Sequence, residues 1–171
     1  MMDWQMMTLV GEDRLGIVSR VTDALYRGGC SLGETSMMRL GGNFTIMMMV
    51  SAGDQPLETL IAQVADELQL QVHIDPIRGE LHQHRVPNFQ VRVVGADRAG
   101  IVAGVTGALA ESGFNVLELE SDVAGSTEQP VYIMTIQGYS EETLERLQSA
   151  LDGLGGDEIE LNISPIETLI G

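Results

Sequence analysis

A stretch of 23 residues occurs twice in this 171-residue chain, and this repeat constrains the fold more than any other feature. Residues 10–32 and 94–116 are identical at 12 of 23 positions, at an offset of 84 residues. A repeat of about half the chain indicates two copies of one small domain. We therefore predict a first domain at 1–78, a polar linker at 79–88 and a second domain at 89–171.

The hydrophobic pattern predicts the same series of elements in both copies. In the first copy, strands are expected at 4–10, 31–40, 44–51 and 72–77, and helices at 17–27 and 56–69. In the second copy, strands are expected at 89–94, 115–123, 131–137 and 159–166, and helices at 101–111 and 140–154. With right-handed crossovers, this order predicts an α+β protein of two ferredoxin-like (βαββαβ) domains in tandem. Each domain is expected to be an antiparallel sheet with both helices on one face.

The sequence also predicts three local features: the core face of the first strands, the length of the second hairpin loop and the start of the last helix. Alternation in the first strand of each copy places Met7 and Leu9 on the core face, together with Phe89, Val91 and Val93. In the second copy the hairpin is expected to have a long loop at 124–130, which changes the offset to 87 beyond it. The last helix is expected to begin near Ser140, which is suited to an N-terminal cap.

Charge and composition exclude several classes of protein. The chain has 25 acidic and nine basic residues, and its net charge is −16. All nine basic residues are Arg, and a surface so acidic repels a phosphate backbone, so direct DNA or RNA binding is not expected. No apolar run is long enough for a membrane helix. Cys30 is the single cysteine and cannot form an internal disulfide, so we expect a cytoplasmic protein.

The repeated motif resembles the signature of the ACT-domain family. In both copies it reads Val-Gly-x-Asp-Arg-x-Gly-Ile-Val, followed by x-x-Val-Thr. A free-standing tandem pair of this length is most similar to the glycine cleavage system transcriptional repressors. The resemblance implies regulation by an amino acid, with glycine as the suspected ligand. It also implies contact with a DNA-binding transcription activator protein, rather than with DNA.

The loops that precede the first helix of each copy are candidate ligand sites. A helix N-terminus offers free backbone N–H groups to a carboxylate, and a glycine lets the backbone approach a ligand closely. A neighbouring aspartate can accept a hydrogen bond from an α-ammonium group. The candidate residues in these loops are Asp13, Arg14, Gly16, Ile17, Asp97, Arg98, Gly100 and Ile101.

The resemblance adds the start of the second strand of a paired domain, where Ser31 and Asn115 stand. Asn115 matches the polar residue often found there in the family, whereas Cys30-Ser31 departs from the pattern. A structural interpretation of the loops stays open, because a tight strand-to-helix turn also requires Gly and Asp, with Asp as the cap.

Neither catalysis nor metal binding is expected. Three histidines, His73, His82 and His84, lie within 12 residues, but a solvated linker explains them better than a metal site. No phosphate-binding loop, nucleophile elbow or zinc motif is present, and there is no Lys, so we expect neither an enzyme nor a cofactor.

Two other functions stay open: an interaction or dimerisation module without a ligand, and an accessory regulatory subunit of a one-carbon or amino-acid enzyme. One side of the strand that contains Met47–Met49 is expected to fill the core. For the other side two interpretations stay open, an interface and core packing, and core packing is favoured. A homodimer is one way to cover such a surface.

Overall fold

The computed structural model describes residues 4–51, 53, 55–77, 85–95, 99–156 and 159–167. The chain divides into two compact units, Met1–His82 and Gln83–Gly171. Residues 79–84 of the predicted linker lie outside the described residues. Asn88, at the linker's predicted end, exchanges hydrogen bonds with the backbone of Ser140 and so packs with the second unit. The domain bounds themselves stay a prediction.

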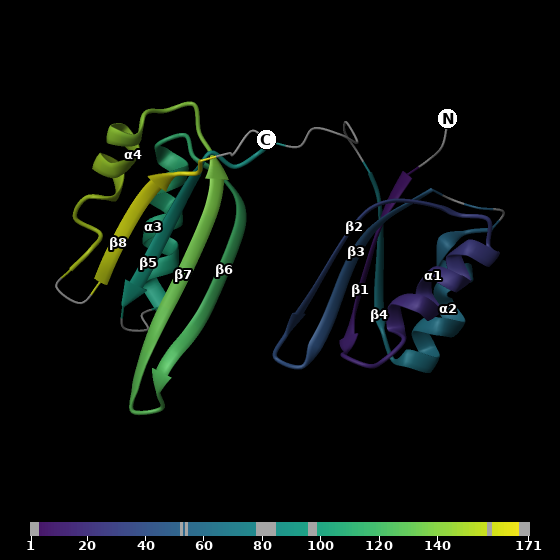
Figure 1. The fold of residues 1–171 in the computed structure, drawn as a ribbon. Coiled ribbons are helices and arrows are strands. Elements are labelled where there is room, and N and C mark those ends of the chain that lie inside the picture. Colours follow the sequence, from purple (N-terminus) through teal and green to yellow (C-terminus); the bar gives the residue numbers. More distant parts are fainter. Residues whose placement is uncertain are drawn as a thin grey trace. The chain divides into compact units, whose positions relative to one another are not determined.

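The described residues of the first unit follow the predicted order of elements. The elements are β1 (Trp4–Glu12), α1 (Ile17–Arg27), β2 (Ser31–Leu40), β3 (Asn43–Ser51), α2 (Leu57–Leu68) and β4 (Gln71–Pro76). They form an antiparallel sheet in the order β2-β3-β1-β4. Both helices lie against the same face of this sheet (Figure 1). A ferredoxin-like unit is therefore confirmed.

The second unit repeats this architecture within its described residues. Its elements are β5 (Phe89–Gly95), α3 (Ala99–Glu111), β6 (Asn115–Ser126), β7 (Gln129–Tyr139), α4 (Leu144–Leu151) and β8 (Ile159–Pro165). The sheet order is β6-β7-β5-β8, which is the order of the first unit. The predicted α+β fold with two tandem ferredoxin-like units is thus confirmed.

Each unit has its own hydrophobic core between its sheet and its helices. The predicted core face of the first strand is confirmed in both units, because Met7, Leu9, Val91 and Val93 are fully buried. Phe89 is also buried. In the first turn of α1, Ile17 is buried and Val18 is exposed, so only Ile17 belongs to the core.

The second hairpin differs from its prediction. β6 and β7 stay paired to Ser126 and Gln129, so most of the predicted loop at 124–130 is strand and only 127–128 form the turn. Leu9 faces Ile46 whereas its equivalent Val93 faces Met134, so the offset beyond the hairpin is 88 and not 87. A slip of one residue exchanges the two faces of a strand. The β6–β7 hairpin also extends past the end of β5, because β6 and β7 stay paired beyond Tyr132, where the pairing of β7 with β5 ends (Figure 1).

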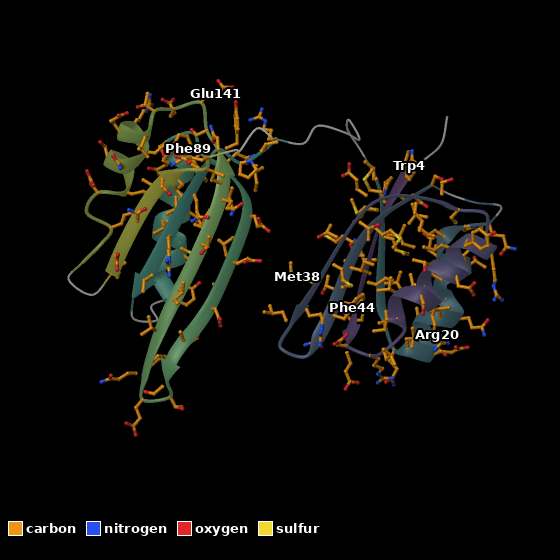
Figure 2. The ribbon with its side chains drawn as sticks, in the orientation of Figure 1. Trp4, Arg20, Met38, Phe44, Phe89 and Glu141 are labelled. Atoms are coloured by element: carbon orange, nitrogen blue, oxygen red, sulfur yellow. The ribbon has the colours of Figure 1, made fainter. Side chains whose placement is uncertain are left out.

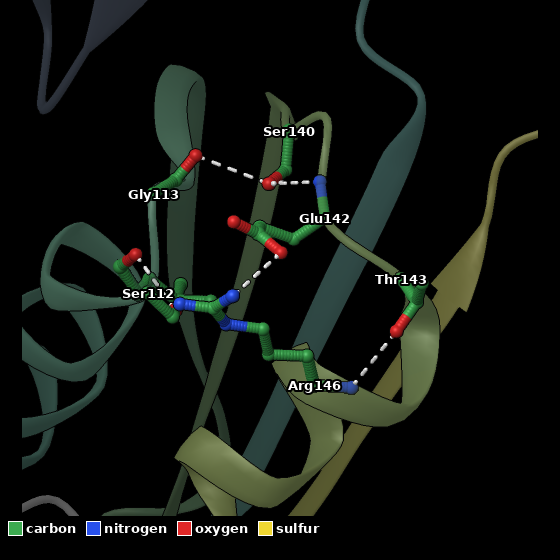
Figure 3. Close-up of polar contacts among 7 residues, drawn as sticks. Ser112, Gly113, Ser140, Glu142, Thr143 and Arg146 are labelled. Carbon is green, nitrogen blue, oxygen red and sulfur yellow. Dashed lines mark hydrogen bonds and ion pairs between the residues drawn. The ribbon is translucent and has the colours of Figure 1, made fainter.

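The last helix is shorter than predicted and begins later. α4 starts after Thr143, whose hydroxyl accepts a hydrogen bond from the backbone N–H of Arg146 at 3.4 Å. Ser140 has a different role: its buried hydroxyl donates to the carbonyl of Gly113 at 3.0 Å and accepts from the backbone N–H of Glu142 at 3.2 Å (Figure 3). The serine thus ties the turn after α3 to the segment before α4.

Among the described residues, no helix is long and apolar enough to cross a membrane.

Candidate ligand-binding site

The loop between β1 and α1 leaves the start of the helix without a side-chain cap. Gly16 is the N-cap residue, with φ of 86° and ψ of 5°, a left-handed conformation that favours glycine. No side chain caps this end, so Asp13 is not the cap that the structural interpretation expected. The hydroxyl of Ser19 donates to the carbonyl of Gly16 at 3.0 Å and leaves the N–H groups of the first turn available. This end of α1 can accept an anion.

Arg39 lies beside the loop, and sequence analysis missed it. Its guanidinium is 2.5 Å from the carboxylate of Asp13, and that carboxylate side chain is only 28% exposed. The backbone N–H of Asp13 donates to the carbonyl of Gly42 at 3.1 Å, which fixes the loop against the hairpin turn. The turn lies there because Glu12 pairs with Asn43 at the end of β1. The position of Arg39, two residues before the Gly41-Gly42 turn, was the available signal.

Arg14 contacts the far side of the loop. Its guanidinium donates to Glu12 at 2.8 Å and to the side-chain carbonyl of Gln69 at 3.1 Å. Gln69 follows α2 in a left-handed conformation, with φ of 54°. Arg14 therefore joins the loop to the end of α2, and it is occupied by these partners.

A surface hollow of about 420 Å³ lies at this loop. Its wall includes the loop, the first turn of α1, and Met37, Arg39 and Phe44 from the hairpin. Leu15 stands fully exposed at its rim. The hollow thus combines a positive helix end, the guanidinium groups of Arg14 and Arg39, the carboxylate of Asp13 and an apolar wall. This set of groups suits a small zwitterion, whose carboxylate needs donors and whose ammonium needs an acceptor.

Ile17 and Ile101 serve the cores rather than the loops. Their side chains are 2% and 8% exposed, so only the backbone of these residues is available to a ligand. Asp97 and Arg98 lie outside the described residues. Gly100 is the second residue of α3, and a Cβ added there would meet no atom within 4 Å. It borders a smaller hollow of about 320 Å³, together with Gly104 and Leu154.

Ser31 and Asn115 lie at the opposite ends of their sheets from the loops. Ser31 pairs with Ser51, which in turn pairs with Trp4 at the beginning of β1. Asn115 pairs with Tyr139 in the same way. Neither unit alone brings its loop and its strand start together, and the predicted use of a paired domain's strand start stays a prediction.

The histidines and the cysteine add no further site to the described part of the chain. His73 lies on β4 with its Nε2 atom 2.9 Å from the carboxylate of Asp75. His82 and His84 lie outside the described residues. No group of three potential metal ligands occurs among the residues that the structure describes. Cys30 is half-buried against the first core.

Two βαββαβ units in tandem define a protein of two ferredoxin-like domains. A family model described as ACT domain matches residues 6–75 and 88–163. The chain therefore belongs to the ACT domain family and is an ACT-domain regulatory protein. No match is found among curated proteins.

Two solved structures resemble the whole chain. A protein of unknown function from Galdieria sulphuraria is 22% identical, with a TM-score of 0.74, and the match covers 98% of this chain and 100% of that one. A protein provisionally assigned as a glycine cleavage system transcriptional repressor is 21% identical, with a TM-score of 0.69 and coverage of 97% and 99%. At this identity the likeness shows a shared fold.

Proposed function

We propose that this protein is an amino-acid-responsive regulator of the glycine cleavage system, and that it acts in the cytoplasm as an anti-activator. It would contact a DNA-binding transcription activator, and glycine would change that contact. Membership of the ACT domain family and a fold similar to that of a provisionally assigned repressor support this proposal. The net charge of −16 also supports it, because such a chain is suited to protein contact and not to DNA.

The hollow at the β1–α1 loop is the observation that carries the proposal. The ligand's carboxylate would bind the N–H groups at the start of α1. The guanidinium of Arg39 would add a second positive group beside it. The ligand's ammonium would bind the carboxylate of Asp13, which shares its charge with Arg39 at 2.5 Å. Ligand and partner need only be coupled by about 1–3 kcal/mol, which is typical of regulation between two sites.

A thermal-shift screen with glycine, serine and other amino acids tests the ligand. A ligand that binds only the folded state stabilises it by about 2.7 kcal/mol at one hundred times its dissociation constant. We expect a shift for glycine that Arg39→Gln removes. The matched control is Arg27→Gln, since Arg27 pairs with Asp23 on the same unit but lies away from the loop. A shift for another amino acid would overturn the glycine assignment and keep the site.

A second candidate function is an interaction module that binds no metabolite. The ion pair between Asp13 and Arg39 favours it, because the loop is already held by that pair and by Arg14 without any ligand. No thermal shift for any amino acid, together with capture of the activator by the purified protein, would support this function over the first.

A further inference from the structure

The first sheet has one face that its helices do not cover. Register places residues of even number on β1 and of odd number on β3 on this outer face, because Met7, Leu9, Ile46 and Met48 fill the core. Seven apolar side chains, four of them methionines, lie on the outer face, with the hydroxyl side chains of Thr8, Ser36 and Thr45 between them. We call this surface the methionine face; it consists of Trp4, Met6, Val10, Met38, Leu40, Met47 and Met49.

Much of the methionine face is open to solvent. Met38 is 61% exposed and Met47 is 47% exposed. Figure 2 shows Met38 on the side of the sheet away from Arg20 of α1. At one end Trp4 crosses the strands: a Cβ added to Gly33 would lie 3.1 Å from both the indole ring and Met49. The face therefore carries exposed apolar side chains, one of them aromatic, separated only by uncharged hydroxyl side chains.

Charged residues lie at the rim of this face. Glu34, the equivalent of Glu118 in the second unit, lies on the edge strand β2 on the same side as Met38. The residues that β1 and β3 contribute between Trp4 and Val10, and between Thr45 and Ser51, carry no charge. Glu12 stands at the end of β1, and the pair of His73 and Asp75 lies on the edge strand β4. An apolar centre with a polar rim is the usual composition of a protein interface.

The equivalent face of the second sheet has a different chemistry. Its register places Arg92 on β5, Thr135 and Gln137 on β7, and a row of carboxylates on the edge strand β6. The carboxylates in that row are Glu118, Glu120 and Asp122. Burying this polar face against methionines would leave its hydrogen-bonding groups without partners, at a cost in free energy. The methionine face is matched best by a copy of itself.

Charge and area also support a second copy of this chain as the partner of the methionine face. Two chains of net charge −16 repel each other, and the uncharged centre of the methionine face lets two copies meet without pairing carboxylates. The whole outer face of the four-stranded sheet, with the polar rim on β4 included, is about 500 Å² at the usual strand spacing, so two such faces bury about 1,000 Å², near the lower limit of specific interfaces.

We propose that two copies of this chain associate through their methionine faces, sheet against sheet, in a twofold dimer. A twofold interface uses the same surface on both copies, so one apolar face is sufficient. Methionine side chains are flexible and adapt to each other across such an interface. This proposal depends on the first sheet alone and holds whether or not an amino acid binds the loop.

Sedimentation of the full-length chain at micromolar concentrations tests the proposal. The test variants are Met38→Asp and Met47→Glu. The fold accepts a carboxylate at the first position, because the second unit holds Asp122 at the equivalent place. The control is Thr135→Glu, which adds the same charge at the position equivalent to Met47 on the other sheet. Circular dichroism checks that each variant is folded.

We expect a dimer for the wild type and for Thr135→Glu. Each test variant should weaken the dimer by about a hundredfold or more, because the interface then buries an unpaired carboxylate. A monomeric wild type would overturn the proposal. So would test variants that still form the dimer, or a monomeric Thr135→Glu, since the contact would then lie elsewhere.

Discussion

The outer faces of the two sheets differ far more than their cores. Leu9 and Val93 fill equivalent core positions, and both are fully buried. On the outer faces, four methionines of the first sheet are replaced in the second by polar or charged residues. The pairs are Met6 and Gln90, Met38 and Asp122, Met47 and Thr135, and Met49 and Gln137. The repeat therefore preserves what the fold requires, and each unit has acquired a surface of its own.

Separate cores predict separate unfolding, which is the largest effect expected. Leu25→Ala and Leu109→Ala remove equivalent, fully buried side chains, and each should cost about 2–5 kcal/mol of unfolding free energy in its own unit. Trp4 is the single tryptophan, so its fluorescence reports on the first unit alone. In urea, Leu25→Ala should shift the fluorescence transition and Leu109→Ala should not. An equal shift in both variants would mean that the units unfold together.

The glycines at the start of α1 and α3 sharpen the comparison, because they are equivalent in sequence and differ in conformation. Gly16 has φ of 86°, whereas Gly100 lies within α3. Gly16→Ala should lower stability by about 1 kcal/mol, since a Cβ is strained in that conformation. Gly100→Ala should raise stability by up to about 1 kcal/mol, because alanine favours a helix. Urea denaturation measures both, and changes of the same sign would contradict the different conformations.

A pH-dependent ion pair in the first unit gives the smallest expected effect. A hydrogen bond from Gln63 at 2.8 Å lowers the pKa of Glu67, and the neighbouring Arg20 lowers it further. Because the folded pKa is below the unfolded one, this stabilisation is present above the ordinary carboxyl pKa and is lost as the pH falls through the lowered value. In the second unit Gly104 replaces Arg20, so this pair has no equivalent there.

Glu67→Gln should therefore slightly reduce the fall in stability of the first unit at acid pH. Denaturation followed by Trp4 fluorescence at several pH values measures the change. The carboxyl is exposed to solvent, so the effect is small. If the ion pair stabilises the fold, Glu67→Gln loses more stability at neutral pH than at acid pH. A loss independent of pH would show that the pair contributes nothing.

Much of the fold could be predicted from the sequence, because apolar periodicity and turn residues act locally. Met7 and Leu9 could be assigned to the core in this way. The register of the second hairpin could not, since the ends of a ribbon depend on pairing with its neighbour and not on its own composition. The start of α4 was misplaced because Ser140 and Thr143 are both suitable caps, and only tertiary contacts select between them.

The candidate site was predicted in part. The glycine and aspartate of the first loop stand where the motif suggested, at the end of β1 and the start of α1. Arg39 was missed because it is 26 positions away from Asp13 in the chain, and only the pairing of β3 with β1 brings the hairpin turn to the loop. The position of Arg39 just before the Gly41-Gly42 turn was the one local signal, and it does not by itself show that this turn lies beside the loop.

Calorimetric titration of glycine into the full-length protein tests the central claim most directly. We expect saturable heat for the wild type and for Arg27→Gln, with binding weakened about tenfold or more by Arg39→Gln, since a charged hydrogen bond contributes roughly 1.5–3 kcal/mol. That result would assign the ligand to the β1–α1 loop. Equal affinity in the wild type and Arg39→Gln, or no heat with glycine at any concentration tested, would contradict a glycine sensor at this loop.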